Sequence, residues 1–393
     1  MRKILVIILY IFSMKLFSQE VVVGLHANPI MYTQTFNVKE KQSSISLPFI
    51  DDFSLQGNIV DNNLWKISSV FVNRSYPINP PTIGVATFDG LDSEGLAYNI
   101  NISNPEGYAD TLESHAIDLY DYDSVFFMFY YQPKGIGDQP EQQDSLILEF
   151  KDQQGNWNRV WQREGGIYHD FRKQVFIIDS IKYLHNDFQF RFLNKATLSG
   201  NFDHWHIDYI KINNFSNMND TIILDDISFV YDCPSFLIRY NEMPWTHFKE
   251  GMFTGNELLD TIDVKLRNNQ ASINVSYQYN VFNEGVQTAH YPNNGLWRNV
   301  SVFDYDSIGN FSFVSPSISI DNNIFNSSVS DSATFIIKHF IETSQNDYKY
   351  NDTLYRFQNF YSHFSYDDGS AESAYGINVN GAKLAYEFKL NRP

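Results

Sequence analysis

The chain has a single cysteine, Cys233, so it cannot form an internal disulfide bond. An exported protein without disulfides depends on large hydrophobic cores, and 33 Phe and 25 Tyr residues can fill them. Cys233 is followed by Pro234 and has no histidine close to it in sequence. We therefore interpret it as a small buried apolar residue rather than a nucleophile.

Positive charge is also scarce, because 28 Lys and Arg residues stand against 46 Asp and Glu residues, for a net charge of −18. An acidic chain repels phosphate backbones and anionic lipid surfaces. This composition argues against nucleic acid as a partner and against polybasic attachment to a membrane. It is compatible with a calcium-rich exterior.

Long apolar runs are missing beyond the N-terminus, where the chain begins "MRKILVIILYIFSMKLFSQE". Arg2 and Lys3 precede an apolar run over 4–12, and small residues follow, which is typical of a secretory signal peptide and too short for a transmembrane segment. We predict a signal peptide over 1–18, cut after Ser18. No cysteine lies near this cut, which disfavours a lipid anchor. The sequence thus predicts export through the inner membrane, to the medium or the outer cell surface.

No segment shows a sustained helical period, and Phe, Tyr, Ile, Val and Asn are abundant. Short alternating segments separated by polar turns are typical of β-sandwiches. The fold class predicted is all-β, with tandem β-sandwiches. After a loosely ordered lead (19–45), a jelly roll over 46–232 is expected to contain strands at 123–133, 144–152, 156–164, 173–180, 187–196, 204–212 and 221–230.

Pro234 and Pro244 interrupt this rhythm and predict a linker over 233–250. A second series of strands follows, whose length suits an immunoglobulin-like sandwich over 251–360. Residues 361–393 contain too few strands to bury a core, and we interpret them as the incomplete start of a further β domain. The predicted strands of the second sandwich lie at 258–269, 273–283, 311–320 and 332–342.

The stretch "NFDHWHIDYIKIN" (201–213) raises the question of a metal site. On a strand, His204, His206 and Asp208 share one face, and the other face holds Trp205, Ile207 and Tyr209. His204 and His206 could bind zinc only with a third ligand from another strand. The alternative is that the two histidines are hydrogen-bonded residues at the rim of a sheet. The unplaced third-ligand candidates are His115, His169 and His185.

Catalytic signatures are missing as well: the sequence has no H-E-x-x-H, no G-x-S-x-G and no P-loop. It therefore predicts a chain that is not an enzyme. Tryptophans could stack on sugar rings, although most tryptophans in sandwiches belong to the core. The six candidates are Trp65, Trp157, Trp161, Trp205, Trp245 and Trp297.

Several motifs resemble known families. "LPFIDDFS" (47–54) and "ILDDISFVY" (223–231) resemble the opening and closing strands of MAM-like or carbohydrate-binding jelly rolls. "DHWHIDYIKIN", "MPWTHF" and "YDDGSAESAYG" resemble stretches of large secreted surface proteins of Bacteroidetes, which are usually exported by type IX secretion. In such proteins the "YDDGSAE" segment starts another sandwich and a sorting domain lies at the far C-terminus. The resemblance implies the type IX machinery as a partner if the full-length chain carries that domain.

The resemblance also implies a structural calcium ion between the first and last strands of the jelly roll. By motif, Asp52 and Asp226 are its expected ligands, and carboxylate oxygens suit Ca²⁺. The alternative is that these aspartates are edge and turn residues in an acidic protein. No EF-hand spacing is present, and no other cofactor is predicted.

A triplet of Asp, then Ser or Thr, then an aliphatic residue recurs along the chain and resembles the O-glycosylation motif of exported Bacteroidetes proteins. A turn that opens a strand would give the same pattern. The hydroxyl residues of these triplets are Thr111, Ser124, Ser145, Ser180, Thr221, Thr261, Ser307, Ser332 and Thr353.

Together these observations predict an exported, non-catalytic cell-surface or secreted protein that acts in adhesion or in binding a glycan or a surface protein. The alternative is an accessory binding region of a secreted peptidase or glycosidase whose catalytic domain lies beyond residue 393.

Overall fold

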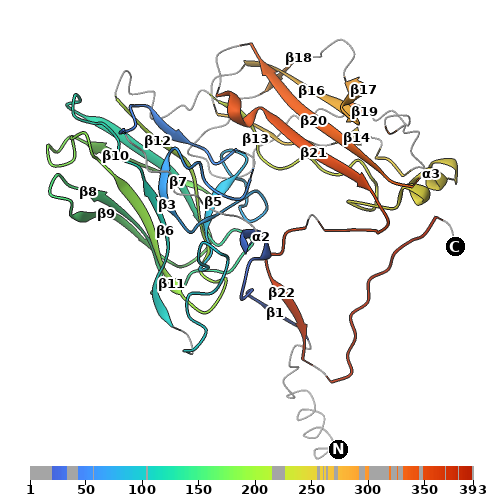
Figure 1. The fold of residues 1–393 in the computed structure, drawn as a ribbon, viewed down its shortest axis with the longest axis horizontal. Helices are drawn as coiled ribbons and strands as arrows, with labels where there is room; N and C mark the ends of the chain where they lie inside the picture. Colours follow the sequence, from blue (N-terminus) through green and yellow to red (C-terminus); the bar gives the residue numbers. More distant parts are fainter. Residues whose placement is uncertain are drawn as a thin grey trace, which may run out of the picture.

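The structure is a computed structural model that describes residues 20–391, except 33–42, 56, 103–104, 215–225, 255–256, 260, 263, 270–272, 292–296, 301–317, 320–324, 326–330, 345–347, 368 and 379. The described elements are nearly all strands. They form two β-sandwiches side by side, the first coloured blue to green and the second yellow to red (Figure 1). The predicted all-β class with tandem sandwiches is confirmed.

The first sandwich consists of two antiparallel sheets. The first sheet contains, in order, β10 (Arg172–Ile178), β7 (Val125–Pro133), β12 (Trp205–Asn214), β5 (Val85–Phe88) and β4 (Phe71–Asn73), with β2 (Phe49–Asp51) also paired to β12. The second sheet contains, in order, β3 (Trp65–Ser68), β6 (Glu106–Ser114), β11 (Phe190–Thr197), β8 (Ser145–Lys151) and β9 (Trp157–Glu164).

Aromatic side chains fill the space between these sheets. Phe127 of β7 lies 4.8 Å from Phe190 and 5.3 Å from Phe150, measured between ring centroids. Phe188, Phe190 and Phe192 are all fully buried, as their alternation predicts. Edge-to-face packing of such rings adds to the stability that their burial provides.

The strand β12 departs from the predicted alternation at one point. Its pairing with β7 shifts register between Asp208 and Lys211, and Tyr209 has a φ of +50°. A bulge of this kind inserts an extra residue, so the side chains after it change face. Trp205 and Ile207 lie in the core between the sheets, whereas Tyr209 packs on the outer face of its sheet. The prediction that Tyr209 shares a face with Trp205 is therefore wrong.

The second sandwich is built on one main sheet and two short strand pairs. The main sheet runs in the order β17 (Val286–Tyr291), β16 (Ile273–Asn283), β20 (Ala333–Thr343) and β21 (Thr353–Phe360), with β18 (Trp297–Val300) also paired to β16. The short pairs are β13 (Ile227–Phe229) with β15 (Leu266–Asn268) and β14 (Thr261–Ile262) with β19 (Ile318–Ser319).

The border between the sandwiches differs from the predicted one. The segment 221–230 was expected to close the jelly roll, but β13 pairs with β15, and Ile227 and Phe229 belong to the second core. Residues 221–225 of that segment lie outside the described residues. The predicted strand at 311–320 is likewise described only at β19.

The predicted linker over 233–250 is in fact part of the second sandwich. It contains the start of a helix, α3 (Trp245–Thr254), directly after Pro244. Cys233, Phe236 and Trp245 are buried in the second core. The two prolines mark loops in this segment rather than a linker between the sandwiches. The helix was not predicted because ten helical residues are too few to show a sustained period in the sequence.

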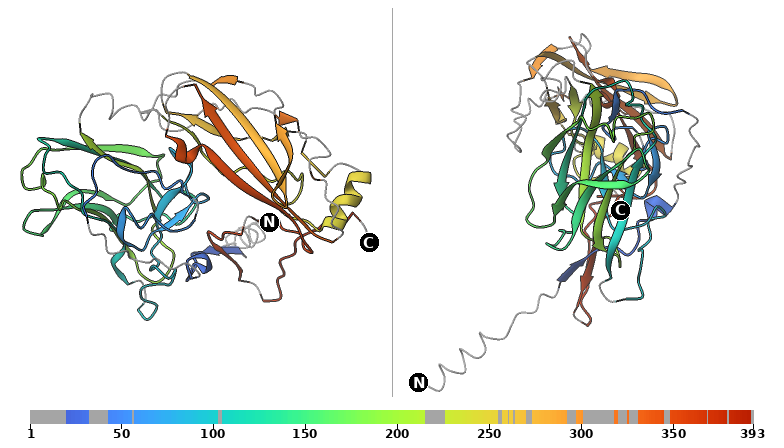
Figure 2. Two further views of the ribbon diagram at one scale, coloured as in Figure 1. Left: turned by 45° about the horizontal axis from the view of Figure 1, so that its top comes forward. Right: turned by 90° about the vertical axis from the view of Figure 1, so that its left-hand side faces the viewer.

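The first strand of the described chain and its last strand form a small ribbon outside both sandwiches. β1 (Glu20–Val23) pairs antiparallel with β22 (Ala374–Ile377) (Figures 1 and 2). The lead, predicted to be loosely ordered, also contains the short helix α2 (Pro29–Tyr32), which packs Met31 against the first sandwich. A 3-10 turn, η2 (Lys349–Asn351), precedes β21. Among the described residues, no helix is long and apolar enough to cross a membrane.

Candidate ligand-binding cleft between the sandwiches

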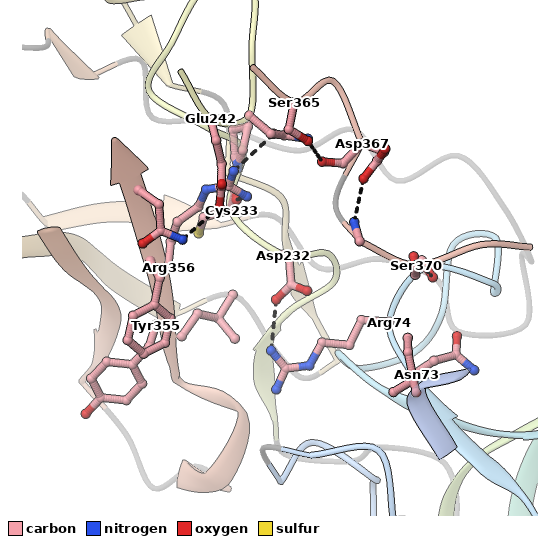
Figure 3. Close-up of a pocket in the computed structure, with 18 of the residues that line it drawn as sticks. Asn73, Arg74, Asp232, Cys233, Glu242, Tyr355, Arg356, Ser365, Asp367 and Ser370 are labelled. Carbon is pink, nitrogen blue, oxygen red and sulfur yellow. Dashed lines mark hydrogen bonds and ion pairs between the residues drawn. The ribbon is translucent and has the colours of Figure 1, made fainter. Parts of the chain in front are cut away.

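A cleft of about 840 Å³ opens where the two sandwiches meet (Figure 3). Its walls come from the loop after β4 on one side and from β21 on the other, and residues 232–242 lie between them. Clefts at domain borders are frequent ligand sites. The lining includes Asn58, Asn73, Arg74, Asp232, Cys233, Asn241, Glu242, Tyr355, Arg356, Phe357, Asn359, His363, Ser365, Asp367 and Ser370.

The floor of the cleft is fixed by hydrogen bonds from β21 to the segment 232–242. Arg356 donates from Nη1 to the carbonyl of Cys233 (3.2 Å) and from Nη2 to Oδ1 of Asn241 (3.0 Å). Gln358 donates from Nε2 to the carbonyl of Asn241 (2.8 Å). Burial raises the pKa of the Cys233 thiol well above its usual range. Cys233 therefore remains a neutral thiol, which is a poor nucleophile.

Charged groups of both sandwiches meet across the cleft. Arg74, which follows β4, forms an ion pair with Asp232 at 2.8 Å between Nη1 and Oδ1. Glu242 accepts a hydrogen bond from Asn359 Nδ2 (2.7 Å) and lies 3.0 Å from Nε2 of His363. Each of these two carboxylates thus has an ion-pair or hydrogen-bond partner within the protein.

The "YDDGSAE" motif forms the rim of the cleft. The residue before the motif, Ser365, donates a backbone hydrogen bond to the carbonyl of Glu242 in the second sandwich (2.9 Å). The end of the motif reaches the first sandwich, where Tyr76 donates from its hydroxyl to the carbonyl of Ala371 (3.0 Å). Asp367 accepts from the backbone of Gly369, whose φ of +91° favours glycine. The motif therefore bridges the two sandwiches.

Two aromatic side chains give the cleft an apolar wall. Tyr355 and Phe357 alternate with buried residues on β21, and their exposed fractions are 43% and 56%. This pair was not among the predicted sugar-binding residues, which were all tryptophans. The signal was present in "TLYRFQNFY" (353–361), where aromatic residues occupy the phase of the strand that faces solvent.

The tryptophans themselves lie elsewhere. Trp65, Trp205 and Trp245 are buried in the cores. Trp157 and Trp161 are half-buried on β9, and the Arg191 guanidinium lies 4.4 Å from the Trp157 ring centroid. The side chain of Trp297 lies outside the described residues.

His204 and His206, the histidines of the stretch 201–213, bind the loop that follows β7. Nδ1 of His204 accepts from the backbone of Asp138 (2.7 Å), and His206 contacts the carbonyl of Lys134 (3.2 Å) and the hydroxyl of Thr87 (2.8 Å). Burial lowers the pKa of His204 to about 4 and that of His206 to about 3. Both rings are therefore neutral hydrogen-bonding groups. In the described part of the chain, no third metal-ligating side chain converges on them.

The two aspartates predicted to bind calcium do come together, and a third residue joins them. Nδ2 of Asn351, from η2, donates to Oδ2 of Asp52 and to Oδ2 of Asp226, each at 3.0 Å. All three side chains are buried. The predicted pair therefore lies at the contact between the sandwiches and not within the first one alone. Calcium at this pair remains a prediction.

The hydroxyl residues of the recurring triplets differ in accessibility. Ser332 and the preceding Asp331 are exposed, whereas Ser145 and Asp144 are buried. Thr111, Ser124, Ser180 and Thr353 are half-buried, and Thr261 opens β14. Thr221 and Ser307 lie outside the described residues.

These differences give a testable prediction about glycosylation. An enzyme that modifies folded protein can reach the hydroxyl of Ser332 but not that of Ser145. We expect glycopeptide mass spectrometry, on protein exported by a bacterium that has this pathway, to find a glycan at Ser332 and none at Ser145. A glycan at Ser145 in folded protein would contradict the prediction, and removal of the Ser332 glycan by Ser332→Ala is the control.

No family model matches this chain, and no curated protein matches it. Among solved structures, the chain is similar to the K1 cleaved adhesin domain of Lys-gingipain from Porphyromonas gingivalis W83, with 14% identity over 42% of this chain and 98% of that chain and a TM-score of 0.28. It is also similar to a family 16 carbohydrate-binding module, with 12% identity over 40% of this chain and 100% of that chain (TM-score 0.25). A further similarity is to an arabinose-bound α-L-arabinofuranosidase, with 11% identity over 49% of this chain and 31% of that chain (TM-score 0.27).

Proposed function

We propose that this chain is an exported, non-catalytic protein that binds a glycan in the cleft between its two sandwiches. The observation that carries the proposal is the partly exposed pair Tyr355 and Phe357 in a cleft whose lining also includes many polar side chains. Sugar rings have an apolar face and a rim of hydroxyls. An aromatic wall beside amides and charged groups offers a partner for each.

The polar groups of the cleft suit hydroxyl recognition. Asn58 and Asn73 come from the first sandwich, and Asn359, Arg356 and Ser370 come from the other wall and the rim. Because Asn359 donates to Glu242 and Arg356 donates to Asn241, these two side chains are held in place before a ligand arrives. Among the described lining residues, Asp232 pairs with Arg74 and Glu242 with His363, which favours binding over hydrolysis.

Export completes the proposal. A basic head followed by a short apolar run at the N-terminus supports passage through the inner membrane. The resemblance of "YDDGSAESAYG" to secreted Bacteroidetes proteins supports the type IX route and a place at the cell surface, in adhesion. An accessory role beside a secreted hydrolase would use the same cleft.

Binding is tested by screening the mature chain on a glycan array and measuring the affinity for the best ligand by calorimetry. Tyr355→Ala and Phe357→Ala are each expected to weaken binding about tenfold, which corresponds to about 1.4 kcal/mol. Tyr350→Ala is the matched control, because Tyr350 is exposed at 65% but does not line the cleft. Its affinity should equal that of the unchanged chain.

Three outcomes would overturn the proposal. The first is that no glycan binds, and capture of a protein ligand in the same cleft would then assign a different partner. The second is equal loss of affinity in Tyr350→Ala and Tyr355→Ala. The third is cleavage of the bound glycan, seen as new reducing ends, because this would make the chain an enzyme.

A further inference from the structure

A group of three carboxylates lies at one end of the first sandwich, away from the cleft. Glu141 and Asp144 belong to the loop between β7 and β8, and Asp203 belongs to the loop between β11 and β12. One oxygen of each lies within 4.8 Å of one oxygen of each of the others. Asp144 and Asp203 are fully buried, whereas Glu141 is exposed.

Each buried aspartate uses only one of its two oxygens within the protein. Oδ2 of Asp144 accepts from the backbone of Glu141 (2.8 Å), and Oδ2 of Asp203 accepts from the backbone of Thr197 (2.7 Å). Oδ1 of Asp144 and Oδ1 of Asp203 are buried without a hydrogen-bond partner. A buried carboxylate oxygen without a partner is costly. This group of three carboxylates contains two such oxygens, and a bound cation would satisfy both.

We infer that Glu141, Asp144 and Asp203 form a calcium site that joins the β7–β8 loop to the β11–β12 loop. Calcium takes oxygen ligands at about 2.3–2.6 Å. Two ligand atoms of one ion are therefore at most about 5 Å apart, and the three carboxylates meet that limit. Because Glu141 is exposed, water can complete the six to eight ligands that calcium prefers.

The ligand chemistry favours calcium over other metals. All three groups offer hard oxygen atoms, whereas zinc prefers nitrogen and sulfur. The neighbouring His204 is not available to a metal through Nδ1, which accepts from the backbone of Asp138. Magnesium requires a tighter octahedral arrangement and loses its water reluctantly.

His204 and His206 hold one of the two loops of this site in place. His204 and His206 hold the first part of the β7–β8 loop through Asp138 and Lys134. Gly137 packs against the His204 ring so closely that a Cβ atom there would lie 2.5 Å from Nδ1. Asp203, the residue before His204, has a φ of +59°, and its backbone N–H donates to Oδ2 of Asp138 in that loop (3.4 Å). The motif "DHWH" therefore contributes its aspartate to the metal and its histidines to the fold.

The experiment uses the mature chain after treatment with chelator, titrated with calcium alone. Calorimetry is expected to show binding, and millimolar calcium is expected to raise the melting temperature by several degrees. Asp144→Asn and Asp203→Asn should each weaken this binding at least tenfold. In chelator both variants should melt no lower than the unchanged chain, because each removes a charge from a repelling group. This behaviour separates ligand loss from misfolding.

Glu106→Gln is the matched control, because Glu106 is a nearby carboxylate that pairs with Lys195 and is no part of the group. It should leave calcium binding unchanged, and magnesium or zinc at the same concentration should bind at least tenfold more weakly. The inference is overturned if chelated and calcium-loaded protein melt identically, because the carboxylates would then share protons. It is also overturned if Asp203→Asn binds calcium like the unchanged chain or if zinc binds more tightly than calcium.

Discussion

Trp65→Ala is expected to lower the free energy of unfolding of the first sandwich by about 4 kcal/mol. Trp65 is fully buried and packs against Phe49, Phe53 and Phe190, with ring centroids 5.5 to 6.1 Å away. Its indole Nε1 also donates to Oδ2 of the buried Asp51 at 2.6 Å. The substitution therefore creates a cavity and removes a donor from a buried carboxylate. Chemical denaturation followed by circular dichroism measures the loss.

Trp65→Phe separates these two contributions. It keeps most of the ring packing and removes only the indole N–H. Burial raises the pKa of Asp51 to about 7, and the bond from Trp65 opposes that rise. When folding raises the pKa of an acid, the protein loses stability as pH rises from the pKa of the unfolded state to the pKa of the folded state. Without the indole the folded pKa is higher still, so the cost of Trp65→Phe should grow between pH 6 and pH 9.

Equal costs of Trp65→Phe at pH 6 and pH 9 would contradict a role for the indole in holding Asp51. Trp157→Phe is the control, since Trp157 is half-buried on the outer face of β9 and no hydrogen bond between its side chain and a carboxylate is described. Its effect on stability should be small and should not depend on pH over this range.

Local pattern was sufficient to predict most strands. The alternation around Phe188, Phe190 and Phe192 identified the buried face of β11, because side chains on a strand alternate strictly between two faces. The same rule failed at Tyr209, since a bulge is set by pairing with β7 and leaves no mark in composition. It also could not show that β13 joins the second sandwich, because the partner of a short strand depends on contacts distant in sequence.

The sites were predicted less well, for a related reason. Asp203 precedes two histidines in the sequence, and only the histidines were considered as zinc ligands. The carboxylates that actually surround Asp203 are about 60 residues earlier in the chain, at Glu141 and Asp144. Only the folded loops bring them together. Tyr355 and Phe357 were missed because 353–360 was not among the predicted strands, and without that strand the solvent-facing phase of its aromatic residues was not recognised.

The pair Asp52 and Asp226 shows what a resemblance can and cannot supply. Motif likeness indicated that the two carboxylates approach each other, and they do. It gave no indication of Asn351, which lies more than 100 residues beyond either motif and donates to both. Burial raises the pKa of Asp52, and the bond from Asn351 opposes this rise. One amide of the second sandwich therefore stabilises two carboxylates buried where the sandwiches meet.

Asn351→Leu is accordingly expected to cost about 3–5 kcal/mol at neutral pH, because it leaves two buried carboxylates facing each other without their shared donor. The cost should fall as pH falls, because burial raises the pKa of Asp52 and a protonated carboxyl no longer repels its neighbour. Asp226→Asn, combined with Asn351→Leu, should recover part of the loss, since only one charge is then buried. A double-mutant cycle measured by denaturation gives this coupling. Equal costs in the single and double variants would contradict it.

Two other variants decide whether this pair also binds calcium. Oδ1 of Asn351 is buried without a hydrogen-bond partner, and the two ends of an amide exchange by rotation about one bond. Turned around, Asn351 would present a third oxygen to an ion between Asp52 and Asp226. We expect Asp203→Asn to leave a smaller calcium-dependent rise in melting temperature, and Asp226→Ala to remove that remainder. If Asp203→Asn alone abolishes the rise, the pair Asp52 and Asp226 binds no calcium and is stabilised by hydrogen bonds such as those from Asn351.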